Sequence, residues 1–174
     1  MSSRPASTLR LCVPGDEQAL ALVGAATFLE AFAGTLDGAD ILAHCRHQHA
    51  EQKYAVWLTS SEAHLCVAEV KQAPVGYAVL CPPDLPITLY PTDLELKRIY
   101  LLHRFQKFGI GAALLQWSVD HARTLGMQRL LLGVYGGNEA ALAFYHRHGF
   151  KQVGTRQFLV GSSLNDDFIL GLDL

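Results

Sequence analysis

The sequence has few charged residues for its length, and the two signs nearly cancel. Lys and Arg number 14 against 16 Asp and Glu, so the net charge is -2 and only 17% of the residues are charged. A protein that binds nucleic acid through phosphate contacts needs a basic excess, which this chain does not have. Half of the residues are apolar, which excludes an intrinsically disordered chain. We therefore expect a globular protein with no nucleic-acid partner.

Long apolar runs are missing as well. The longest, Ala19 to Leu29, is interrupted by Gly24 and Thr27, whereas a helix that crosses a bilayer needs about 20 apolar residues. Residues 1–8 carry no apolar core of the kind that secretory signals contain. We therefore expect no membrane partner and predict a cytoplasmic protein.

Cysteine is scarce, and its spacing excludes the usual cysteine sites. The four residues are Cys12, Cys45, Cys66 and Cys81. Without a Cys-x-x-Cys pair they predict neither a zinc site nor a redox site. Among the eight histidines, His44, His47 and His49 lie close together, but a metal site needs a further ligand at the same point. We expect no metal, and we place His44 and His47 on a solvated helix face.

Apolar periodicity divides the chain into the elements of one expected domain, residues 1–174. Alternating or continuous apolar runs predict strands at residues 8–13, 64–70, 75–80, 94–102, 130–135, 150–160 and 167–174. Helical spacing predicts helices at 16–33, 38–57, 109–126 and 138–148, with Asp16 and Asn138 as N-caps. Four prolines make residues 81–92 a loop. This order predicts a mixed α/β fold with helices on both faces of one sheet.

The junction before the third predicted helix carries the first chemical signal. It reads Arg104-Phe-Gln-Lys-Phe-Gly109-Ile-Gly111-Ala, with two glycines at a helix start. Glycines remove the Cβ atoms that would block a ligand, and the backbone N–H groups of a helix N-terminus attract anions. The pattern fits a pyrophosphate, although the same glycines could serve only a tight turn.

A second segment, residues 138–150, carries a further motif. It reads Asn138-Glu-Ala-Ala-Leu-Ala-Phe-Tyr145-His-Arg-His-Gly149-Phe150. Together with Gln106-x-x-Gly109-x-Gly111, it resembles the two cofactor motifs of the Gcn5-related N-acetyltransferase (GNAT) family, over almost the whole chain. Residues 94–101, 105–109, 132–134 and 160–167 also resemble the PaiA-type polyamine acetyltransferases. The resemblance implies a mixed, mainly antiparallel sheet of about seven strands in which strands four and five splay apart.

The resemblance also assigns the cofactor site. Acetyl-CoA is the implied cosubstrate, with its pyrophosphate on the backbone amides of the glycine loop and its pantetheine arm on the fourth strand. A backbone N–H there, that of Leu101, would stabilise the developing oxyanion. Asn138 would reach the pantetheine or the sulfur. The implied cofactor-binding residues are Ile99, Tyr100, Leu101, Gln106, Lys107, Phe108, Gly109, Ile110, Gly111, Ala112, Asn138 and Tyr145.

Two side chains are the implied catalytic groups. Tyr145 corresponds to the general acid of the family, because a phenol is protonated at neutral pH and can give its proton to a departing thiolate. Core packing is its alternative role. Glu95 lies where many family members have a glutamate that takes the proton of the amine through water. It could instead form a same-face pair with Lys97, and His103 is then the second-choice base.

These features predict an acetyl-CoA-dependent N-acetyltransferase in which a small primary amine, with polyamines among the candidates, attacks the thioester directly. The alternatives are a protein or peptide N-acetyltransferase and a non-catalytic CoA-binding sensor. The loop 81–92 and the first helix, with Phe28 and Phe32, could close a small pocket, which favours a small amine. Glu30, Asp84 and Asp93 are candidate contacts for a cationic acceptor. The resemblance also allows a homodimer.

Overall fold

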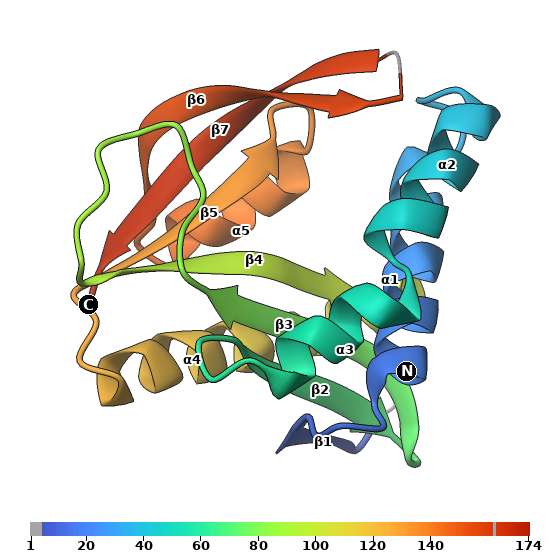
Figure 1. Cartoon of the computed structure of the whole chain (residues 1–174), viewed down its shortest axis with the longest axis horizontal. Coiled ribbons are helices and arrows are strands. Elements are labelled where there is room, and N and C mark those ends of the chain that lie inside the picture. The colour runs from blue at the N-terminus through green and yellow to red at the C-terminus, as the bar shows by residue number, and fades with distance from the viewer. Residues whose placement is uncertain (1–4, 162) are drawn as a thin grey trace.

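One seven-stranded sheet organises the fold (Figure 1). The computed structural model describes residues 5–161 and 163–174. Its strands are β1 (Ser7–Leu11), β2 (His64–Val70), β3 (Ala73–Cys81), β4 (Asp93–Leu101), β5 (Arg129–Tyr135), β6 (Lys151–Val160) and β7 (Ser163–Asp173). The order across the sheet is β1-β2-β3-β4-β5-β7-β6. Neighbouring strands are antiparallel except for β4 and β5, which are parallel. The predicted mixed, mainly antiparallel sheet is confirmed.

Helices cover both faces of this sheet, as predicted. On one side lie α1 (Glu17–Phe32), α2 (Gly38–Gln48) and α3 (Glu51–Thr59); on the other lie α4 (Ile110–Thr124) and α5 (Glu139–Arg147). Leu114 of α4 and Leu130 of β5 belong to the larger apolar core, on the α4 side. Leu20 of α1 and Val79 of β3 belong to a smaller core on the opposite side. Among the residues described, no helix is long and apolar enough to span a membrane.

β4 and β5 pair only briefly and then separate. Their parallel register covers residues 93–95 of β4 against 129–131 of β5. Beyond it, β4 stays paired with β3 as far as Leu101, and β5 stays paired with β7 as far as Tyr135. The facing edges of β4 and β5 therefore have no strand partner in this part of the sheet. This opening, which we call the splay, confirms the predicted separation of strands four and five.

A β-bulge in β4 lies where the splay begins. Leu80 of β3 pairs with Leu96, but its neighbour Val79 pairs with Arg98, so Lys97 is the extra residue. An extra residue changes which side chains face each side of the strand. Leu96 joins the core beneath α4, whereas Arg98 hydrogen-bonds with residues of the α1–α3 side. The bulge thus turns a basic side chain into the interior.

The helix predicted over residues 38–57 is wrong in one respect, because it is broken into α2 and α3. α2 ends at Gln48, and Ala50 has extended backbone angles (φ -66°, ψ 141°) before α3. The side chain of His49 is buried and its Nδ1 lies 2.8 Å from the hydroxyl of Tyr54. The freed carbonyl of Gln48 accepts a 2.6 Å hydrogen bond from Arg98. Contacts with β4 therefore stabilise the break.

Three strand boundaries differ from the sequence predictions by two residues or more, and the first is the end of β1 at Leu11 rather than at Val13. Lys71 and Gln72 both adopt positive φ (50° and 64°) and close a two-residue hairpin turn, so β3 begins at Ala73 rather than at Val75. β7 begins at Ser163 rather than at Asp167 because its pairing with β6 continues to the end of the hairpin.

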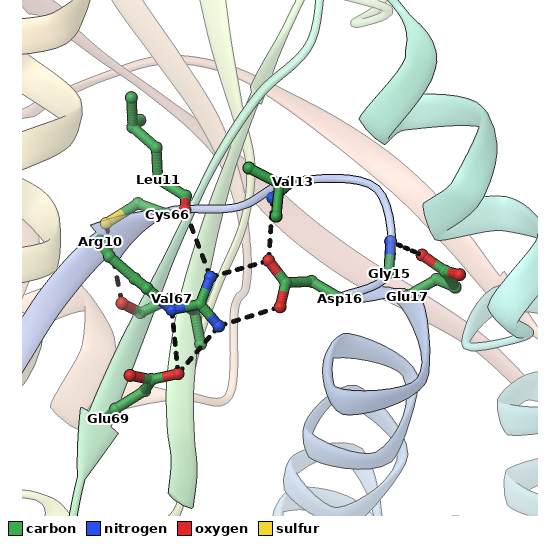
Figure 2. A network of polar contacts seen from close by, with 9 residues as sticks. All are labelled: Arg10, Leu11, Val13, Gly15, Asp16, Glu17, Cys66, Val67 and Glu69. Carbon is green, nitrogen blue, oxygen red and sulfur yellow. Dashed lines mark hydrogen bonds and ion pairs between the residues drawn. The ribbon is translucent and has the colours of Figure 1, made fainter. Parts of the chain in front are cut away.

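Asp16 precedes α1 but does not cap it with its side chain. Its carboxylate instead accepts the N–H of Val13 at 2.8 Å and both ends of the Arg10 guanidinium at 2.8 and 2.9 Å. Arg10 also pairs with Glu69 of β2 at 2.9 Å. Figure 2 shows Arg10 between the two carboxylates. The predicted N-cap position of Asp16 is confirmed, and this network, which joins the end of β1 to the start of α1, explains why its side chain makes no cap hydrogen bond.

Candidate functional site

The glycine loop lies between the 3-10 turn η1 (His103–Phe105) and α4, at the open end of the splay. Lys107 and Gly109 both have positive φ (66° and 83°), with Phe108 between them. Such alternation turns successive backbone N–H groups toward one side, a geometry that binds anions. The first intrahelical bond runs from the N–H of Ala113 to the carbonyl of Gly109 at 3.0 Å. The preceding N–H groups at this helix start are therefore available to an anion.

Only one of the two loop glycines is required by the fold itself. Gly109 needs its conformation, because a positive φ is unfavourable for other residues. A Cβ on Gly111 would lie 3.8 Å from the side chain of Leu101, an ordinary contact. Gln106 fastens the loop to β4, since its side-chain amide donates to the carbonyl of Leu101 at 3.3 Å. Its own N–H donates to the carbonyl of His103 at 3.0 Å.

The end of β4 presents backbone groups to the splay. The N–H of Leu102 donates to the carbonyl of Val75 on the β3 side at 3.0 Å. Because successive residues of a strand direct their backbone groups to opposite edges, the N–H groups of Leu101 and Ile99 are directed toward the splay. The side chain of Tyr100 packs on the α1–α3 side, 5.8 Å from the ring of His49. The binding of a pantetheine arm to these groups stays a prediction.

Tyr145 of α5 is almost buried, with 7% of its surface exposed. It packs edge-on against Phe144 and Phe150, with ring centroids 5.3 and 5.6 Å apart. Burial, with a smaller contribution from Tyr100, raises the pKa of its phenol well above the usual value. Among the described residues, its hydroxyl has no hydrogen-bond partner. Tyr145 is thus a protonated phenol with an uncommitted hydroxyl.

Asn138 occupies the predicted N-cap position of α5. Its side-chain oxygen accepts the N–H of Ala141 at 3.0 Å, which confirms the cap. The residue directly follows the turn after β5, the strand that forms the second edge of the splay. Its role toward the pantetheine stays a prediction.

Glu95 lies at the point where β4 and β5 part, and it is 1% exposed. Its carboxylate accepts the N–H of Asp84 at 2.9 Å and pairs with Lys97 at 3.2 Å. The Glu95–Lys97 pair considered from the sequence is therefore present. The role of Glu95 as a base stays a prediction. His103 is exposed, and its backbone N–H donates to the carboxylate of Glu30 of α1 at 3.0 Å.

The carboxylate of Asp93 is committed to the fold. It pairs with Arg129 of β5 at 2.6 Å and accepts the N–H of Tyr90 at 2.7 Å. Burial alone would raise its pKa, but the hydrogen bonds from Arg129 and Tyr90 outweigh burial and lower it. These contacts hold β4 against β5 beside the splay.

The first helix and the proline-rich loop pack at separate places. Phe28 stacks on His44 of α2 at 4.0 Å, and Phe32 lies 5.9 Å from the ring of Tyr135. Leu85 of the loop packs instead on the part of the sheet formed by β5 and β7.

The prediction of a solvated histidine face is correct for His47 and wrong for His44. His47 is exposed, whereas His44 is partly buried, and burial lowers its pKa to about 4. Stacking on Phe28 explains the difference. Within residues 5–161 and 163–174, no group of three or more His, Cys, Asp and Glu is placed to hold a metal ion.

A buried polar cluster beneath α1 and α3 was missed by sequence reasoning. Arg98 is 8% exposed and donates to the hydroxyl of Tyr54 at 2.6 Å, which lies 2.5 Å from the hydroxyl of Tyr77. Gly24 of α1 leaves room for the cluster, because a Cβ there would lie 2.7 Å from the Tyr77 hydroxyl and closer still to His49. These residues come from separate segments, so no spacing in the sequence announces them.

The splayed sheet with a glycine loop at its open end is the arrangement in which comparison with known proteins identifies an N-acetyltransferase. The Acetyltransferase (GNAT) family profile matches residues 31–150. An uncharacterized N-acetyltransferase of Mycobacterium tuberculosis is 31% identical over 159 residues, which cover 91% of this chain and 98% of that relative. The chain belongs to the Acetyltransferase (GNAT) family and is an N-acetyltransferase.

Solved structures agree on the fold. The PaiA N-acetyltransferase of Thermoplasma acidophilum, solved in complex with coenzyme A, superposes with a TM-score of 0.82 at 21% identity, covering 97% of this chain and 99% of that chain. The ribosomal-protein-alanine N-acetyltransferase of Brucella melitensis superposes with a TM-score of 0.70 at 25% identity, covering 96% and 99%. The acceptor of this chain does not follow from this likeness, because one fold can serve different acceptors.

Proposed function

We propose that this protein transfers the acetyl group of acetyl-CoA directly to a small primary amine. The observation that carries the proposal is the continuity between the unpaired edge of β4 and the anion-binding loop. Gln106 joins the two, and the loop opens toward the same end of the splay. An extended thiol arm that ends in a pyrophosphate matches this arrangement of backbone donors. Residues 1–174 would act as one acetyltransferase domain.

The residues would divide the reaction between them. The pyrophosphate would accept hydrogen bonds from the backbone of Lys107–Ala112, and the helix dipole of α4 would favour its charge. The backbone of Ile99–Leu101 would hold the pantetheine arm and, through the N–H of Leu101, the oxyanion. Asn138 would contact the arm from the opposite edge of the splay.

Transfer then needs one bond to form, one to break and three protons to move. Glu95 first takes, through water, the proton of the ammonium, so that the neutral nitrogen attacks the thioester carbon, a C–N bond forms and the C–S bond breaks. The departing thiolate takes the phenol proton of Tyr145, and the proton that the nitrogen loses as the amide forms restores the phenol. A protonated, unbonded phenol suits the acid role, because no competing acceptor holds its proton.

A substitution at Gly109 tests the cofactor site. Gly109→Glu places a negative side chain at the N-terminus of α4, where the pyrophosphate would bind, so acetyl-CoA affinity should be lost. Gly126→Glu is the matched control, because Gly126 also has positive φ (74°) but lies beyond the opposite end of the same helix, with nothing within 4 Å of its Cβ position. Calorimetry measures both affinities, and circular dichroism checks both folds. Unchanged affinity in a folded Gly109→Glu variant contradicts the proposed site.

A further inference from the structure

A pocket of about 390 Å³ lies between α3 and the bulged part of β4. Its lining includes Lys53 and Trp57 of α3, with Lys97 and Arg98 of β4. In β4 these two residues directly precede Ile99–Leu101, the stretch to which the pantetheine arm is assigned above. Each strand residue advances the chain by about 3.3 Å. The Cα atom of Arg98 therefore lies about 3–10 Å along β4 from those of Ile99–Leu101, a separation that a small acceptor can span.

Arg98 is a buried cation whose protein partners are all neutral. Its guanidinium donates to the hydroxyl of Tyr54 at 2.6 Å and to the carbonyl of Gln48 at 2.6 Å, and it lies 3.3 Å from Nδ1 of His49. Burial raises the pKa of Tyr54 to about 12 and lowers that of His49 to about 3, so both side chains are uncharged at neutral pH.

No carboxylate within the described part of the chain lies at ion-pair distance from Arg98. A buried charge in a folded protein is nearly always paired, because the unpaired charge loses its hydration without compensation. The fold therefore leaves a positive charge beside the pocket that an anionic ligand could neutralise.

Lys53 adds a second positive charge at the same place. Its Nζ donates to the side-chain oxygen of Gln48 at 2.6 Å and lies 6.0 Å from the centre of the Trp57 ring. The guanidinium carbon of Arg98 lies 4.9 Å from the centre of that ring. Burial, then the charges of Arg98 and Lys97, lower the pKa of Lys53. Both cations thus lie close to one indole, and a bound anion that contacts both would relieve their repulsion.

The other charged groups of the pocket do not cancel this excess. Lys97 is already paired with Glu95 at 3.2 Å. Glu62 and Asp84 also line the pocket, but both are exposed, and solvent screens exposed charges strongly. The deeper positive charges of Lys53 and Arg98 therefore dominate the interior of the pocket.

We propose that this pocket binds the carboxylate of the acceptor, so that the acetylated amine belongs to an amino carboxylate, such as an amino acid, rather than to a polyamine. The inference rests on the function proposed above and names its acceptor. A carboxylate bound by Lys53 and Arg98 leaves the amine free to extend toward the splay, while the face of Trp57 packs against the carbon skeleton. A polyamine carries only positive charges, which the same two residues would repel.

Matched pairs of acceptors test this assignment. The rates with a set of amino acids are compared with the rates with the corresponding decarboxylated amines, for example lysine with cadaverine. Spermidine is added as a polyamine. Release of coenzyme A thiol gives kcat/KM, corrected for the fraction of neutral amine. The kcat/KM of the amino carboxylate should exceed that of its decarboxylated partner at least about tenfold, chiefly through a lower KM, because hydrogen bonds between charged groups are the strong ones.

Variants of Lys53 show whether the pocket is responsible. Lys53 is the better position for substitution, because its side chain is partly exposed, whereas a change at the buried Arg98 would also disturb folding. Lys53→Met should remove the preference, Lys53→Arg should keep it, and Lys151→Met, a change at an exposed position of β6, should leave it intact. Better use of the decarboxylated amines or of spermidine overturns the proposal, as does a preference that survives Lys53→Met.

A second measurement separates this inference from the proposed function. Calorimetry with amino acids in the absence of acetyl-CoA compares wild type with Lys53→Met, so it reports on the pocket even without turnover. Equal affinities of the two proteins overturn the pocket assignment alone. Failure of wild type to bind acetyl-CoA overturns the proposed function, whatever the amino acids do.

Discussion

Tyr145→Phe removes one oxygen atom from the site and should slow acetyl transfer without weakening acetyl-CoA binding. The phenol is needed only when the thiolate departs, and its ring keeps the contacts with Phe144 and Phe150. Because the hydroxyl has no bonding partner among the described residues, its removal should leave the unfolding temperature unchanged or slightly raised.

The size of the rate effect follows from the role of the phenol as an acid. General acid catalysis typically contributes about 10²–10⁴-fold, which corresponds to about 2.7–5.4 kcal/mol in the barrier. Burial raises the pKa of Tyr145, so the wild-type phenol stays protonated through the neutral and mildly alkaline range. The defect of the variant should therefore be the same at every pH in that range.

Rapid-quench measurement of a single turnover is the assay, because product release can hide the chemical step. Tyr90→Phe serves as the control, since Tyr90 is 56% exposed in the loop before β4. A single-turnover rate within a factor of about two of wild type, at saturating acetyl-CoA, refutes the acid role and leaves Tyr145 as a packing residue.

Two further predictions concern carboxylates of β4. If Glu95 takes the amine proton through water, Glu95→Gln should lower kcat with little change in acetyl-CoA affinity. The loss of kcat should shrink as pH rises, because more of the amine is then already neutral. Coincident pH–rate profiles of variant and wild type would eliminate Glu95 as the base. The lowered pKa of Asp93 means that its ion pair with Arg129 stabilises the fold above the unfolded-state value of 3.8 and is lost as pH falls through the lower native value. Urea unfolding should therefore show less acid sensitivity in Asp93→Asn than in wild type, and equal sensitivity would contradict this linkage.

The strands and the glycine loop could be predicted because local sequence determines them. The continuous apolar run at residues 130–135 is a strand buried on both faces, and the two glycines begin α4 where expected. The break after Gln48 could not be predicted from the chain around it. It depends on Arg98, whose hydrogen bond to Gln48 links residues 50 positions apart. The N-cap position of Asp16 was predicted correctly, but its side chain makes no cap hydrogen bond because Arg10 pairs with the carboxylate.

The residues of the candidate site also differ in how far the sequence predicts them. Tyr145, Asn138 and Gly109 lie in segments whose motifs are continuous, so a resemblance could identify them. The positively charged pocket depends on Lys53 and Trp57 of α3 and on Arg98 of β4, which meet only because the β4 bulge turns Arg98 inward. A charge pattern assembled by tertiary structure leaves no periodic signal in the sequence.

The splay also has a consequence for the amount of folded protein in a cell. Beyond Glu95 and Leu131, the facing edges of β4 and β5 have no strand partner in the described part of the chain, so a pantetheine arm bound there would take the place of a strand between them. A ligand that binds only the native state, present at 100 times its Kd, adds about 2.7 kcal/mol of stability. Folded enzyme would then accumulate when acetyl-CoA is plentiful and would be degraded faster when it is scarce. The supply of the acetyl donor would thereby set how much enzyme exists, as well as how fast each molecule works.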